Sequence, residues 1–104
     1  MIKQIKVEEL NIRLLDNEVV LIDVREQKEI EICSIEKAIH IPMNNIASSI
    51  DQFDKNTIYA IMCHSGIRSH NVSFYLQNMG FNVLNVEGGI NEWSNVIDSS
   101  MERY

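Results

Sequence analysis

The sequence predicts an α/β fold in which helices flank a central, mainly parallel sheet. Short continuous apolar runs occur at residues 19–22 and 58–62, and they are rich in β-branched and aromatic side chains. Such runs are typical of strands that are covered on both faces, as in a parallel sheet. Segments with apolar residues at helical spacing alternate with these runs, which is the pattern of an α/β layer fold.

Three amphipathic segments predict the main helices. Each places apolar residues three or four positions apart: Val7, Leu10 and Leu14; Val72, Tyr75, Leu76 and Met79; and Ile90, Trp93 and Ile97. Gly80 follows the second segment and is typical of the residue just beyond a helix end. Shorter apolar runs predict further strands at residues 2–5, 39–41 and 83–86, and a short helix is expected over residues 46–53.

Length and composition indicate one globular domain over residues 1–104. The chain is 45% hydrophobic and 23% charged, with a formal net charge of -6, which argues against a nucleic-acid partner. Two cysteines are too few for a disulfide framework and suggest a reduced thiol protein. The N-terminal residues do not resemble a signal peptide, and no apolar run approaches the roughly 20 residues that span a membrane. We therefore expect a cytoplasmic protein without a membrane partner; its oligomeric state is left open.

Two polar clusters follow the two most strongly apolar strands. Asp23 and Arg25 come after the first, and residues 63–68 come after the second. Because ligands of open α/β sheets bind beyond the carboxyl ends of the strands, we expect both clusters at one edge of the sheet. This edge is the predicted site.

The segment from Cys63 to Arg68 has the residues needed to ionise a thiol. Gly66 permits a sharp turn with positive φ, so that backbone N–H groups and the following helix N-terminus can face the sulfur. A thiolate is the reactive form of cysteine, and nearby His64 and Arg68 would favour it. The alternative is that Cys63 is a buried small hydrophobic residue and His64 an exposed loop residue.

Four blocks of the sequence resemble the single-domain rhodaneses, a family of sulfurtransferases. These blocks are residues 21–26, 38–42, 63–69 and 86–90 with Trp93, in the order and at about the separations of that family. The resemblance implies a rhodanese-like three-layer fold over the whole chain. It also implies that Cys63 takes a sulfane sulfur from a donor such as thiosulfate, becomes a persulfide, and passes the sulfur to a thiol or cyanide.

The resemblance also implies roles for the other residues of the loop. His64, Ser65, Gly66, Ile67 and Arg68 would bind the substrate, without a cofactor or a metal. Physiological exchange would take place with small sulfur compounds or with a sulfur-relay protein partner. For Arg68, a surface ion pair with Glu87 or Asp23 is an equally open role.

Three residues are expected to support the loop rather than to contact substrate. Asp23 and Arg25 match the Asp-x-Arg pattern of the family, and Ser69 is expected to cap the helix that begins near residue 68 or 69. Cys33 stands in a region where the family usually has Gly-His-Ile. It is expected to fill the core, or else to act as a thiol that resolves an oxidised or persulfidated Cys63.

Two rival functions remain to be distinguished. Phosphatases and arsenate reductases of the same fold class use five residues between cysteine and arginine. Here four residues separate Cys63 from Arg68, and this shorter cradle favours sulfur over a tetrahedral phosphate. The second rival is a persulfide carrier or a regulatory binding module without turnover of its own.

Overall fold

The five strands form one parallel sheet in the order β1-β5-β4-β2-β3. The structure is a computed structural model that describes residues 1–104. The strands are β1 (Gln4–Ile5), β2 (Val20–Asp23), β3 (Ile39–His40), β4 (Ile58–Met62) and β5 (Asn82–Val86). The predicted α/β fold with a parallel central sheet is confirmed, although β1 is shorter than the expected run over residues 2–5.

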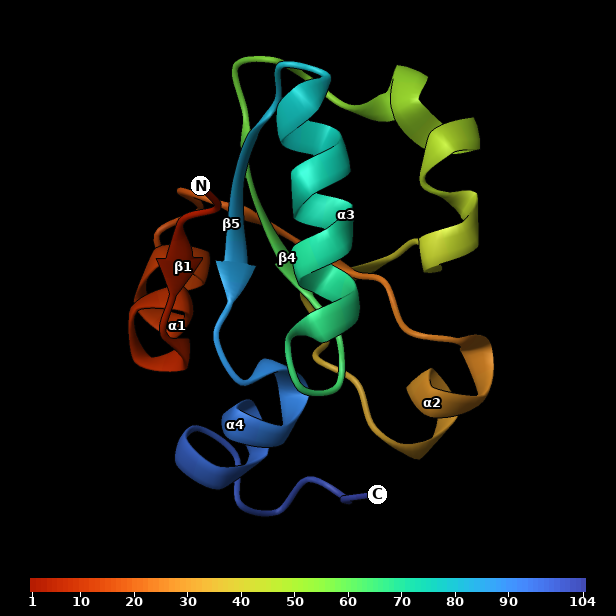
Figure 1. Ribbon diagram of the computed structural model, residues 1–104. Coiled ribbons are helices and arrows are strands. Elements are labelled where there is room, and N and C mark those ends of the chain that lie inside the picture. Colours follow the sequence, from red (N-terminus) through yellow and green to blue (C-terminus); the bar gives the residue numbers. More distant parts are fainter.

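Helices cover both faces of this sheet and give the predicted three layers (Figure 1). The α-helices are α1 (Val7–Leu15), α2 (Gln27–Ile32), α3 (Ile67–Asn78) and α4 (Gly89–Val96). Two 3₁₀-helices, η1 (Met43–Asn45) and η2 (Ala47–Gln52), form where one short helix is expected. None of these helices is both long enough and apolar enough to cross a lipid bilayer.

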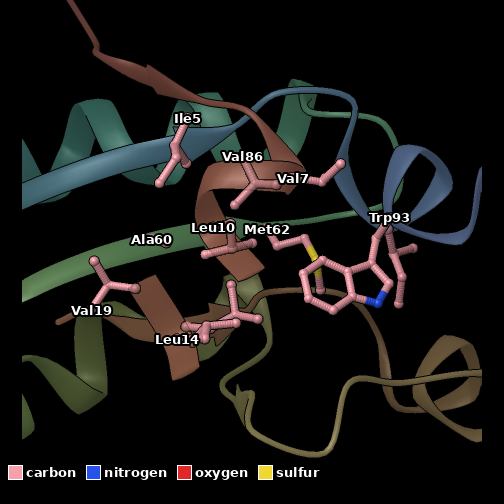
Figure 2. Packing of buried hydrophobic residues seen from close by; sticks show 11 residues of the cluster. Ile5, Val7, Leu10, Leu14, Val19, Ala60, Met62, Val86 and Trp93 are labelled. Atoms are coloured by element: carbon pink, nitrogen blue, oxygen red, sulfur yellow. The ribbon is translucent and has the colours of Figure 1, made fainter. Parts of the chain in front are cut away.

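The central strand β4 supplies side chains to two separate hydrophobic cores. Ala60 and Met62 belong to the core beneath α1 and α4, which Figure 2 shows. Tyr59 and Ile61 belong to the core beneath α3 and the 3₁₀-helices. Because successive strand residues point to opposite faces, a continuous apolar run fills both cores, as the sequence indicates.

Helix α2 is present in the structure, but the apolar pattern of the sequence does not predict it. None of its residues is buried, so it has no apolar stripe to reveal it. A capping box forms its N-terminus, in which the Glu26 and Glu29 side chains each accept a hydrogen bond from the other's backbone N–H. The spacing of these two glutamates is the local signal that could have revealed the helix.

Helix α3 begins at Ile67, earlier than expected, and the prediction that Ser69 caps it is wrong. The N-cap is Gly66, whose φ of 114° lies in the region that favours glycine. Ser69 is instead a fully buried residue of the first turn. Tyr75 and Met79 are also more exposed than their apolar spacing predicts, because Ser69 and Ser73 occupy part of the buried face.

Candidate active site

Cys63 directly follows β4 and lies beside the segment that follows β2. The parallel register places Asp23 opposite Met62, and the N–H of Val24 donates to the Met62 carbonyl at 2.9 Å. The two polar clusters therefore meet at the carboxyl edge of the sheet, as the sequence predicts.

The sulfur of Cys63 is buried and surrounded by hydrogen-bonding groups. The Gly66 N–H donates to Sγ at 3.0 Å, and the thiol donates to Ser69 Oγ at 3.4 Å. Burial alone would raise the pKa of the Cys63 thiol. Hydrogen bonds from Ser69, and from the amides of Gly66 and Ser65, outweigh burial and lower this pKa below its ordinary value. The loop is therefore arranged to hold a thiolate.

Helix α4 fixes the backbone of this loop through hydrogen bonds to its carbonyl groups. The N–H groups of Ile90 and Asn91 donate to the carbonyls of Cys63 and His64, at 2.9 and 3.0 Å. A Cβ on Gly89 would lie 2.5 Å from the Cys63 carbonyl oxygen, so only glycine allows this close approach. With its carbonyls held by α4, the loop keeps its N–H groups free to face the sulfur. Gly89 is a supporting residue that the sequence analysis includes only within the block of residues 86–90.

Arg68 forms an ion pair with a residue that the sequence does not indicate as its partner. Its guanidinium forms a two-pronged ion pair with Glu29, with Nη1–Oε1 and Nη2–Oε2 distances of 2.7 and 2.8 Å. Neither expected partner, Glu87 nor Asp23, takes this position. The hydrogen bonds from Arg68 hold the pKa of the Glu29 carboxyl well below its usual range, against the opposing effect of burial.

Asp23 and Arg25 form a fully buried ion pair next to the loop. Arg25 Nη2 donates to Asp23 Oδ2 at 2.8 Å and to the Cys33 carbonyl at 2.9 Å, and Nη1 donates to the Tyr104 hydroxyl at 2.9 Å. Arg25 thus joins the end of β2 to the end of α2 and to the C-terminal residue.

The two cysteines belong to different sides of the sheet. Cys63 is part of the core under α3, whereas Cys33 is half-buried against the core under α1 and α4. Cys33 Sγ also accepts a long hydrogen bond of 3.8 Å from Arg25 Nη1. This placement favours the core-filling interpretation of Cys33 over that of a resolving thiol.

The remaining loop residues form the outer rim of the site. Ser65 and Ile67 are exposed, and the ring of His64 stacks on the ring of Tyr104 with their centroids 4.2 Å apart. Figure 1 shows the end of the chain between α4 and α2, which brings Tyr104 to this rim. Nothing in the sequence indicates that the last residue reaches the loop. No three His, Cys, Asp or Glu side chains converge to hold a metal ion.

Asn85 is a further residue beneath the loop that the sequence analysis does not single out. It is 3% exposed on β5, and its Oδ1 accepts a hydrogen bond of 2.5 Å from Ser69 Oγ. Its Nδ2 donates to the Gly66 carbonyl and to Gln4 Oε1, both at 3.2 Å. An amide inside the apolar run of residues 83–86 is the signal that could have revealed it, because a buried polar group needs partners.

Together the fold and the loop define an α/β domain that presents an ionisable cysteine at the carboxyl edge of a parallel sheet. The family model for the Rhodanese-like domain matches residues 6–96. The chain therefore belongs to the rhodanese-like family.

Individual relatives agree with this assignment. YtwF of Bacillus subtilis, which is named as a sulfurtransferase, is 45% identical over 78 residues, which cover 75% of this chain and 76% of YtwF. The sulfurtransferase of Allochromatium vinosum is 38% identical over 96 residues, which cover 90% of each chain. The solved rhodanese-like domain protein of Staphylococcus aureus superposes with a TM-score of 0.86 at 38% identity and covers 99% of both chains.

A longer relative combines such a domain with another activity. The adenylyltransferase and sulfurtransferase UBA4 of Debaryomyces hansenii is 40% identical over 95 residues, which cover 82% of this chain and 21% of UBA4. The names of these relatives support sulfur transfer as the general activity of the domain.

Proposed function

We propose that this protein is a rhodanese-type sulfurtransferase that carries a sulfane sulfur as a persulfide on Cys63. The observation that carries this proposal is the placement of the Cys63 sulfur 3.0 Å from the Gly66 N–H at the start of α3. Amide donors and a helix N-terminus stabilise negative charge on sulfur in the thiolate and in the persulfide alike. The relatives named as sulfurtransferases support the same class of reaction.

The proposed reaction has two displacement steps. The Cys63 thiolate attacks the outer sulfur of thiosulfate, the S–S bond of the donor breaks, and sulfite leaves with the bonding electron pair. The product is Cys63–S–S⁻. Cyanide or a thiolate then attacks the outer sulfur of this persulfide, and Cys63 leaves as a thiolate with the electron pair. No net oxidant or reductant is needed.

We assign the substrate-binding role to the loop from His64 to Arg68. The exposed side chains of Ser65 and Ile67 flank the approach to the loop, and Gly66 directs its N–H to the sulfur. Such a loop accepts sulfur from a small donor or from a relay protein, and UBA4 offers a precedent for pairing this domain with a second activity. We place the reaction in the cytoplasm, because the chemistry requires Cys63 to stay reduced.

Intact mass spectrometry after incubation with thiosulfate tests this proposal. The protein is expected to gain the mass of one sulfur atom and to lose it again on treatment with cyanide. Cys63→Ser should abolish the gain and Cys33→Ser should retain it. A Cys63→Ser protein that still acquires the sulfur would show that the nucleophile is assigned wrongly.

The second candidate function is a persulfide carrier that needs a protein donor. It is favoured by the ion pair between Arg68 and Glu29, which occupies the arginine that would otherwise attract a small anionic donor. Thiosulfate:cyanide turnover distinguishes the two functions. A carrier would show no turnover but would still form the Cys63 persulfide when incubated with a cysteine desulfurase and cysteine.

A further inference from the structure

The Ser69 hydroxyl lies between two groups that compete for its single proton. It is 3.4 Å from Cys63 Sγ on one side and 2.5 Å from Asn85 Oδ1 on the other. When Cys63 is a thiol, both contacts are satisfied, because S–H donates to Ser69 and the Ser69 O–H donates to Asn85. When Cys63 is a thiolate, both neighbours of Ser69 are acceptors. Its proton can then serve only one of them.

The side-chain amide of Asn85 cannot rotate by half a turn, which would exchange its oxygen and nitrogen, without losing hydrogen bonds. Its Nδ2 group faces two acceptors, the carbonyl of Gly66 and Oε1 of Gln4, each at 3.2 Å. A flipped amide would place its oxygen against both of these oxygens. Asn85 therefore always presents an acceptor to Ser69.

We propose that Asn85 is a positioning residue that draws the Ser69 hydroxyl proton away from Cys63 and thereby limits how readily Cys63 ionises. This inference rests on the proposed function only in taking Cys63 as the reacting thiol. The backbone N–H groups of Ser65, Gly66 and Ser69 stabilise the thiolate whichever way the Ser69 hydroxyl points. The hydroxyl adds to them only when its O–H turns from Asn85 to the sulfur.

The pKa of Cys63 affects the two steps of sulfur transfer in opposite ways. A thiol with a very low pKa is mostly ionised and leaves readily, but it is also a weaker nucleophile. By competing for the Ser69 proton, Asn85 keeps the Cys63 thiol from the lowest pKa that the loop could produce. Cys63 can then serve both as the attacking group and as the leaving group.

Other charged and titratable groups near Cys63 are paired with each other. They come from α2, α3, the end of β2, the loop itself and the C-terminal residue: Glu29 with Arg68, Asp23 with Arg25, and His64 stacked on Tyr104. None of these contacts involves Ser69 or Asn85. Variants of Ser69 and Asn85 therefore test the competition for the Ser69 proton without disturbing these pairs.

The test is the pH dependence of iodoacetamide alkylation, measured at Cys63 alone by peptide mass spectrometry. Asn85→Leu has nearly the shape of asparagine but no acceptor, and it is expected to lower the pKa of Cys63 by about one unit, the effect of one hydrogen bond to a charged group. In a Ser69→Ala background the same substitution should cause no shift. The Gly66 carbonyl keeps its hydrogen bond from the His70 N–H in all these variants.

Asn85→Asp is the matched control, because it keeps the acceptor and adds charge. Its charge is expected to raise the pKa of Cys63 in any background, and the rise should be larger with Ser69 than with alanine at position 69. An unchanged or raised pKa in Asn85→Leu, or an equal shift of that variant with and without Ser69, would overturn the proposal. If circular dichroism shows that Asn85→Leu is unfolded, the two Asn85→Asp shifts decide, and equal shifts with and without Ser69 overturn the proposal.

This measurement uses no sulfur donor. A protein that fails to form a persulfide but shows the expected alkylation shifts would contradict the proposed function and leave the role of Asn85 standing.

Discussion

Glu29 of α2 and Arg68 of α3 are joined by a two-pronged ion pair whose N–O distances are 2.7 and 2.8 Å. The Glu29 side chain is 12% exposed and also accepts hydrogen bonds from the Tyr104 hydroxyl at 2.7 Å and from the Glu26 N–H at 3.0 Å. This pair ties the first turn of α3, and with it the loop that holds Cys63, to α2. It also neutralises the charge of Arg68, the arginine to which the family resemblance assigns a role in substrate binding.

The first prediction concerns the donor. Glu29→Gln should free the charge of Arg68 and lower the KM for thiosulfate roughly fivefold at low salt, since one charge pair near the surface contributes about 1 kcal/mol. High salt should reduce the difference, because it screens the attraction. Glu31→Gln removes the same charge from an exposed position of the same helix and is the control. Equal KM values for Glu29→Gln and the wild type would show that Arg68 does not attract the donor.

The second prediction concerns stability and pH. Because the pKa of Glu29 is lowered in the folded protein, its contribution is fully present above the ordinary carboxyl pKa and is lost as the pH falls below it. The free energy of unfolding of the wild type, measured in urea, should therefore fall between about pH 5 and pH 3. Glu29→Gln should show a shallower dependence over the same interval. Parallel curves for the two proteins would mean that the pair does not contribute to folding.

The third prediction concerns the support of the loop by α4. Gly89→Ala should destabilise the protein by about 2 kcal/mol, because its φ of 58° and the nearby Cys63 carbonyl both oppose a Cβ. It should also slow alkylation of Cys63 by moving the loop. Gly80→Ala is the control, since Gly80 also has a positive φ but its Cβ would meet only the flexible Lys55 side chain. Slowed alkylation in both variants would mean that general destabilisation is the cause.

The fourth prediction compares the two thiols. Because its pKa is lowered, Cys63 should be alkylated at neutral pH several-fold faster than Cys33. Peptide mass spectrometry of the wild type after a short exposure to iodoacetamide measures both rates in one sample. Equal, slow rates at the two positions would contradict an activated Cys63.

Apolar patterns predict the sheet and three helices correctly, because strands and helices bury residues at fixed local periods. The run at residues 58–62 becomes the strand that feeds both cores, and Val7, Leu10 and Leu14 form the buried face of α1. Helix α2 is missed for the converse reason, since none of its residues is buried. The start of α3 is missed because Gly66, and not a hydroxyl side chain, occupies the N-cap.

The sequence by itself determines that a cysteine loop with a turning glycine stands at the carboxyl end of a buried strand. These properties depend on neighbouring residues, and local patterns report them. Only the tertiary structure decides which groups surround that loop. Glu29 reaches Arg68 across 39 positions of the chain, and Asn85 reaches Ser69 across 16. Such contacts join single side chains on different elements, so no local period marks them, and the packing of the layers alone brings them together.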